Sequence, residues 1–142
     1  MASETSIEDN IIHRNKHTPF GGASGLEDWV EEGVDWSGAT FVMTIAEAEG
    51  AAAKITLNGA TAGSQGISAT FDAGHVSEVT GAVVGATTIR PQIDETTFEG
   101  LTTFPTAPAP YELVYDLLCT PSGEPQRVIY HGTFTIYHGV GD

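Results

Sequence analysis

Apolar and polar positions alternate most regularly in the last third of the chain, residues 111–137. Within residues 111–118, tyrosine and leucine occupy every second position, which places them on one face of an extended strand. Residues 128–137 form a second alternating run, interrupted at Gly132, where we expect a bulge or a close backbone approach. The segment between the runs, residues 120–125, contains two prolines and a glycine, which favours a loop of roughly four to six residues over a two-residue turn. The pattern predicts a β-hairpin.

Shorter alternating runs precede this hairpin, and they predict further strands at residues 39–45, 54–58 and 67–71. Residues 73–110 are less regular. There, residues 82–90 predict a strand pair around Gly85, and Asp94 with Gly100 predicts the two ends of a single helical turn. Many short strands separated by turn residues, without a long helical pattern, are typical of a β-sandwich. We therefore expect an all-β fold, an antiparallel immunoglobulin-like sandwich of roughly six to eight short strands.

Residues 1–33 differ in composition from the rest, and we interpret them as an N-terminal arm or edge strand joined by a linker to a sandwich formed by residues 34–142. The linker is the glycine-rich segment that begins at Phe20. Such an arm either contributes an edge strand or reaches a neighbouring subunit. Docking on a neighbour orders the arm at an entropic cost, so it requires buried anchors. The candidate interface residues are Ile11, Ile12, Phe20 and Trp29.

Charge restricts the classes of partner. Lysine and arginine total 5 against 19 aspartate and glutamate, which gives a net charge of −14. A nucleic acid or an anionic membrane requires clustered basic residues, so we expect neither as a partner. The polar, acidic N-terminus does not resemble a signal peptide, and no apolar run reaches membrane-spanning length. The single cysteine, Cys119, lies in an apolar strand and is interpreted as a buried structural thiol.

Residue patterns for chemistry are absent. His13 and His17 are four residues apart, but the sequence around them does not favour a helix and offers no third metal ligand. Carboxylate pairs such as Glu47 with Glu49 are better explained by a solvated acidic surface than by acid–base catalysis. No nucleophile motif or phosphate-binding loop is present. We expect a protein that is not an enzyme and that has no catalytic residue, metal or cofactor.

Two segments resemble a known family. Residues 35–40 (Asp-Trp-Ser-Gly-Ala-Thr), which lead into Phe41, are similar to the "DLTGAT" strand start of small immunoglobulin-like proteins of tailed bacteriophages and prophages. Residues 114–117, a turn with Gly123, and residues 132–136 resemble the "YDL…G…G.F.V" ending of the same family. Members are described as tail, baseplate or fibre-attachment components, and they are similar to the N-terminal domain of baseplate upper proteins.

The resemblance implies a structural component of a tailed phage virion, an adaptor in the tail, baseplate or fibre-attachment region. It would be made in the host cytoplasm without a signal peptide and reside in the virion. Its partners would be other virion proteins and copies of itself. A capsid decoration protein is the alternative within the structural class. A carbohydrate-binding module is the alternative from another class, because exposed tryptophan and tyrosine rings would stack on sugars; Trp29 and Trp36 are the residues whose substitution tests it.

Overall fold

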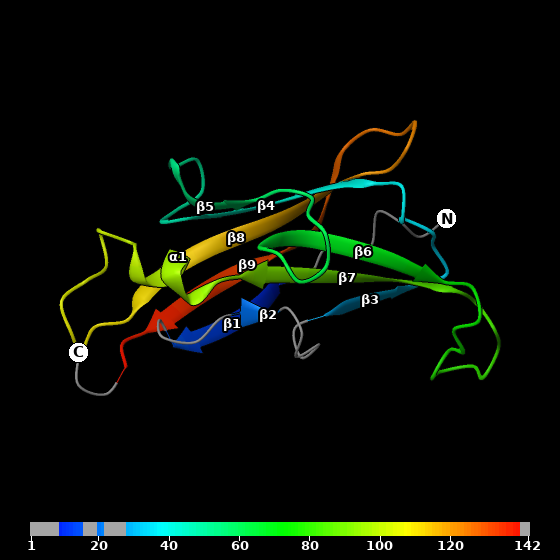
Figure 1. The fold of residues 1–142 in the computed structure, drawn as a ribbon, viewed down its shortest axis with the longest axis horizontal. Coiled ribbons are helices and arrows are strands. Elements are labelled where there is room, and N and C mark those ends of the chain that lie inside the picture. Colours follow the sequence, from blue (N-terminus) through cyan, green and yellow to red (C-terminus); the bar gives the residue numbers. More distant parts are fainter. Residues whose placement is uncertain (1–8, 16–19, 22–27, 140–142) are drawn as a thin grey trace.

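The structure, a computed structural model, describes residues 9–15, 20–21 and 28–139, and in residues 9–15 it describes the backbone only. These residues form two β-sheets and one short helix (Figure 1). The elements are β1 (Asp9–Asn15), β2 (Phe20–Gly21), β3 (Trp29–Glu32), β4 (Thr40–Ala46), β5 (Ala53–Leu57), β6 (Gly66–Asp72), β7 (Ala86–Ile93), α1 (Glu95–Glu99), β8 (Tyr111–Thr120) and β9 (Arg127–Tyr137). Eight of the described strands have four or more residues, and β2 has two.

The strand order is that of an immunoglobulin-like sandwich. One sheet has the order β1-β9-β8-β4-β5. In the other, β7 is central, with β6 along one edge and both β2 and β3 along the opposite edge. In chain order, β4, β5, β8 and β9 take the places of immunoglobulin strands C, C′, F and G, while β3, β6 and β7 take those of B, D and E. The predicted all-β sandwich is confirmed.

One strand pair departs from the antiparallel expectation. Strand β1 runs parallel to β9, with Ile11 opposite Thr133 and Ile12 opposite Phe134. Antiparallel neighbours are favoured where a short hairpin joins them, but β1 and β9 come from the two ends of the chain. No hairpin therefore constrains their direction.

The predicted terminal hairpin is present as β8 and β9, paired from Tyr111 opposite Ile136 to Cys119 opposite Arg127. Its irregularity lies elsewhere than expected. The register shifts between Leu117 and Leu118, opposite Ile129, whereas the sequence suggested a bulge or a close backbone approach at Gly132. The extra residue Ile129 is fully buried, so the bulge turns one more apolar side chain into the core.

The described parts of residues 1–33 belong to the sandwich. Strand β1 forms the edge beside β9, and β2 and β3 pair with β7. Gly21 is required where β2 meets β7, because a Cβ at this position would lie 2.0 Å from the carbonyl oxygen of Pro91. Of the two roles expected for this segment, the structure shows the strand within the chain's own sheets. The division between residues 33 and 34 itself stays a prediction.

The segment between β6 and β7 also differs from expectation. Residues 82–90 do not pair with each other around Gly85. Instead, Val83 forms an isolated bridge with Val76, and β7 begins at Ala86 and pairs with β3 and β6. The predicted helical turn is present as α1, which follows Asp94 and ends at Gly100.

Aromatic side chains join the two sheets and close one end of the core. The ring of Phe20 meets the ring of Phe134 edge-on, with their centroids 5.3 Å apart, and so connects β2 to β9. Phe98 of α1 is fully buried, and its centroid lies 6.0 Å from that of Phe134. Helix α1 therefore covers the end of the sandwich opposite to the β6–β7 connection (Figure 1).

Candidate functional site

The outer face of the five-stranded sheet carries side chains that face away from the core. Register aligns them in three rows across β4, β8 and β9: Val42–Leu118–Val128, Thr44–Asp116–His131 and Ala46–Val114–Thr133. Beside these rows, the connection between β4 and β5 forms a wall through residues 48–51. Together they enclose a groove, open to solvent, with a volume of about 750 Å³. We call it the outer-face groove. It is lined by Thr44, Ala46, Ala48, Glu49, Gly50, Ala51, Val114, Tyr115, Asp116, Val128, His131, Gly132 and Thr133.

Asp116 is the unusual residue of this groove. Its Oδ1 atom is buried and has no hydrogen-bond partner among the described residues. Burial raises the pKa of the Asp116 carboxyl above its ordinary value, and the positive charge of a protonated His131 opposes that shift. A buried carboxylate oxygen without a donor destabilises the isolated chain. The partial burial of Asp116 follows from its neighbours, since it lies between Val114 and Leu118 on the same face of β8.

The groove combines polar and apolar groups, as binding surfaces do. Asp116 and His131 are cross-strand partners within its lining. Its polar groups are two carboxylates, one imidazole and two threonine hydroxyls, set among alanine and valine side chains. Such a surface holds a ligand by hydrogen bonds and apolar contact.

A second feature is the loop of residues 73–85, which connects β6 to β7 and projects from one end of the molecule (green in Figure 1). We call it the valine loop, because its exposed apolar side chains are Val76, Val79, Val83 and Val84. Val79 is 91% exposed, the highest value among the exposed large apolar side chains. Four valines in nine residues, held out in solvent, are a local concentration of apolar surface.

Hydrogen bonds within the valine loop fix its shape. The amide of Ser77 donates to the carbonyl of Ala82 at 2.9 Å, and the amide of Val84 donates to the carbonyl of His75 at 3.0 Å. The buried hydroxyl of Ser77 accepts from the amides of Val79 and Thr80. The loop is therefore a small hairpin of defined shape, and little chain entropy is lost when a partner docks on it.

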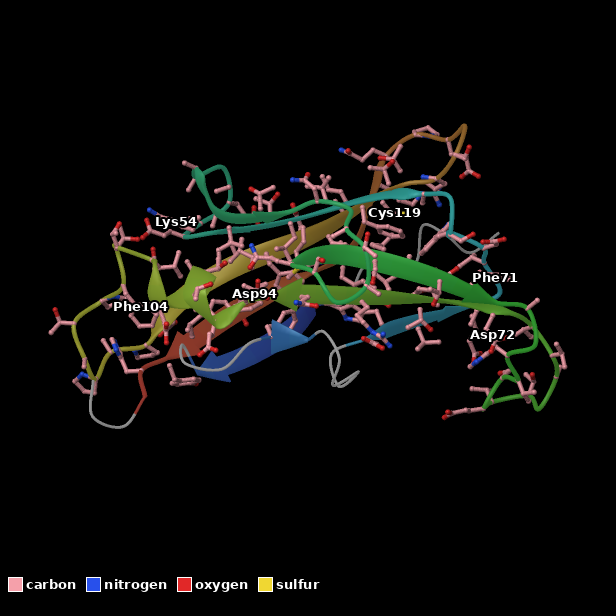
Figure 2. The ribbon with its side chains drawn as sticks, in the orientation of Figure 1. Lys54, Phe71, Asp72, Asp94, Phe104 and Cys119 are labelled. Carbon is pink, nitrogen blue, oxygen red and sulfur yellow. The ribbon has the colours of Figure 1, made fainter. Side chains whose placement is uncertain are left out.

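The base of the valine loop is tied to both neighbouring strands. Nε2 of His75 lies 2.8 Å from Oε2 of Glu32 on β3, and this contact lowers the pKa of Glu32. Figure 2 shows Phe71 and Asp72 where β6 runs into the loop. The ring of Phe71 lies against Gly85, where a Cβ would approach it to 2.8 Å. With φ at +67°, Gly85 also has a backbone conformation that favours glycine.

The four predicted interface residues have different positions. Ile11 and Ile12 lie on β1 at the edge of the five-stranded sheet, and their side chains fall outside the described residues. Phe20 is 1% exposed and belongs to the chain's own core. An anchoring role for Phe20 on a partner would require it to leave that core. The assignment of these residues to an interface stays a prediction.

Trp29 has partners within the chain. Its ring stacks on Tyr130 with centroids 4.7 Å apart, and on Tyr115 at 6.4 Å. The hydroxyl of Tyr130 donates a hydrogen bond to Glu31, which lies two residues after Trp29. Trp36 is 6% exposed and lies in the core. Trp36 therefore offers no open ring to a sugar, and the half-buried ring of Trp29 stacks on two tyrosines of the same chain. The carbohydrate-binding alternative stays a prediction.

Within the described part of the chain, no group of three or more histidine, cysteine, aspartate or glutamate side chains is placed to hold a metal ion. No described helix is long and apolar enough to cross a membrane. Cys119 is fully buried, and burial raises the pKa of its thiol to about 11. The thiol is therefore protonated at neutral pH and is not a nucleophile there.

Comparison with known proteins adds no family: no family model matches the chain, and no curated protein matches it.

Sequence reasoning identified neither the outer-face groove nor the valine loop. The loop carried a signal, because four valines lie among three glycines at positions 74, 81 and 85 without an alternating pattern to bury them. Asp116 also carried a signal, because this charged residue lies between Val114 and Leu118 on the outward face of the predicted strand. The wall formed by residues 48–51 had none, since loop position depends on how β4 and β5 pair.

Proposed function

We propose that this chain is a structural component of a tailed phage virion, an adaptor in the tail, baseplate or fibre-attachment region that acts by binding other proteins. Two observations support the proposal. The resemblance of residues 35–40, 114–117 and 132–136 to small immunoglobulin-like phage proteins is one. The other is the immunoglobulin-like strand order in which those segments lie.

The valine loop is the observation that carries a binding role. Exposed apolar patches on soluble proteins mark interaction sites, and hydrogen bonds hold this patch in a defined shape. Val79 at the tip and Val83 on the returning strand present the largest exposed apolar fractions. An anchor of this kind buries its side chains in an apolar pocket of the partner.

The test is incorporation into particles. Phage particles are assembled with the wild-type chain or with the double variant Val79→Ser and Val83→Ser, and the copies retained in purified particles are counted by quantitative mass spectrometry. We expect the double variant to be folded but incorporated at least tenfold less. The matched control is Val30→Ser, since Val30 is 48% exposed but lies on β3. Absence of the wild-type chain from purified particles contradicts the proposal.

The same particles separate the two structural alternatives. Gold labelling or a particle map places the chain at the tail and baseplate if it is the proposed adaptor. Label on the head instead identifies a capsid decoration protein and overturns the tail assignment.

A further inference from the structure

The outer-face groove contains an acceptor without a donor. Oδ1 of Asp116 is removed from water and from every hydrogen-bond donor in the described residues. A buried acceptor in this state costs more free energy than a paired one, so the chain itself compensates the charge of this carboxylate poorly. Asp116 as a residue is half-buried and lines the groove, so the part of the carboxyl group that is not enclosed faces solvent there. The carboxylate of Asp116 is thus available to accept a hydrogen bond from another molecule.

The charge of the groove selects the kind of donor. Its lining holds two carboxylates, Glu49 on the wall and Asp116 on the floor, and no lysine or arginine among the described residues. His131, opposite Asp116, is the one other titratable side chain of the lining whose charge bears on a ligand. With the whole chain at −14, the potential in the groove favours a cation. A charged donor also forms the stronger bond with a carboxylate.

The apolar side chains of the lining favour a cation that also has an apolar part. Ala46, Val114 and Val128 lie on three adjacent strands around Asp116, so a group that reaches the carboxylate must pass over methyl groups. Arginine and lysine combine a charged head with a chain of methylene groups that packs on apolar surface. A small hydrated metal ion gains nothing from these walls.

We propose that the outer-face groove binds an arginine or lysine side chain of a partner protein, with Asp116 as the acceptor at its floor and Glu49 at its rim. The proposal rests on the proposed function only in taking the occupant to be a protein chain. The arrangement also fits the charge imbalance of the chain, since an acidic protein that assembles with others is matched by basic partner surfaces.

The experiment is a titration of the full chain, labelled with ¹⁵N, by a short amidated peptide of alanines around one arginine. The control peptide has citrulline at the same position, which keeps the shape and removes the charge. We expect the arginine peptide to shift the backbone amide signals of Thr44, Asp116 and His131, and the citrulline peptide to leave them unchanged. Asp116→Asn should lower the affinity for the arginine peptide about tenfold or more, as expected for the loss of a hydrogen bond to a charged group.

Glu112→Gln is the matched control variant, because Glu112 lies on the same face of β8 but outside the groove. It should bind as the wild type does. Equal binding by Asp116→Asn, equal loss in Glu112→Gln, or signals spread evenly over the acidic surface each overturn the proposal. Free arginine that binds as tightly as the peptide overturns the protein occupant in favour of a small cation. Particle incorporation plays no part in this readout, so failure of the groove and failure of the virion role are distinguishable.

Discussion

The side chain of Thr87 accepts a hydrogen bond from the backbone amide of Trp36 at 2.8 Å. The same hydroxyl donates to the carbonyl of Val34 at 2.7 Å. Thr87 is fully buried on β7. Its hydroxyl therefore provides a hydrogen-bond partner for two backbone groups of the connection between β3 and β4. Two residues of this connection, Val34 and Trp36, are thereby fixed to the central strand β7.

Thr87→Val tests this bridge. Valine keeps the volume but leaves the amide of Trp36 and the carbonyl of Val34 without their partner, and such groups cost about 1–3 kcal/mol when buried. The free energy of unfolding, measured by urea denaturation, should fall by about that amount. Thr88→Val, one residue along β7 on the half-buried face, should change it far less. Equal effects of the two substitutions contradict the bridge.

Removal of residues 1–33 should abolish cooperative folding. The truncation deletes β1, β2 and β3, and so takes Phe20 from the core and leaves one edge of β7 unpaired. Thermal unfolding followed by circular dichroism should show no sharp transition for residues 34–142 alone. Addition of residues 1–33 as a separate peptide should restore it. A cooperative transition at the wild-type midpoint would show that these residues are an appendage.

Trp29→Ala distinguishes a core role from an interface role. Loss of the stacks on Tyr130 and Tyr115 should lower the free energy of unfolding of the isolated chain by about 2–3 kcal/mol. Trp29→Phe retains an aromatic ring and should lose less than half of that. Unchanged stability of the alanine variant, in urea at neutral pH, would favour a role at a partner's surface.

Asp116→Asn should stabilise the isolated chain at neutral pH. The folded-state pKa of Asp116 lies above the ordinary value of 3.8, so the folded chain holds this proton more tightly than the unfolded chain does. Ionisation of Asp116 therefore destabilises the fold as the pH rises above 3.8, and below that value the contribution is absent. Urea midpoints of wild type and variant should converge in acid and separate at neutral pH. Glu112→Gln should show no such divergence.

Cys119 should be unreactive in the folded chain. Its thiol pKa is raised from 9.0 to about 11, so a thiol reagent at neutral pH should react only as fast as the chain unfolds. The unfolded thiol ionises near pH 9 and the folded one near 11, so stability should decline between these values. Cys119→Ala should lack the part of the decline that comes from the thiol. A rapid reaction without denaturant would contradict the burial.

Local alternation in the sequence was sufficient to predict the terminal hairpin, which the structure places at β8 (Tyr111–Thr120) and β9 (Arg127–Tyr137). Each of the predicted strands at residues 39–45, 54–58 and 67–71 lies within one or two residues of β4, β5 or β6. Alternation works here because these strands bury one face, so every second residue must be apolar. The all-β class follows from that pattern and from the turn residues that interrupt it.

Beyond the terminal hairpin, only the tertiary structure decided which strands pair and what covers them. The sequence around Phe20 has a linker's composition, yet Phe20 lies in the core against Phe134, because burial depends on neighbours that are distant in sequence. Residues 82–90 have the composition of a strand pair, but residues 86–90 pair with β3 and β6, and Val83 forms a bridge with Val76. Asp116 is likewise an ordinary outward residue in the sequence. Only the packing around it leaves Oδ1 of its carboxylate buried, without a donor among the described residues.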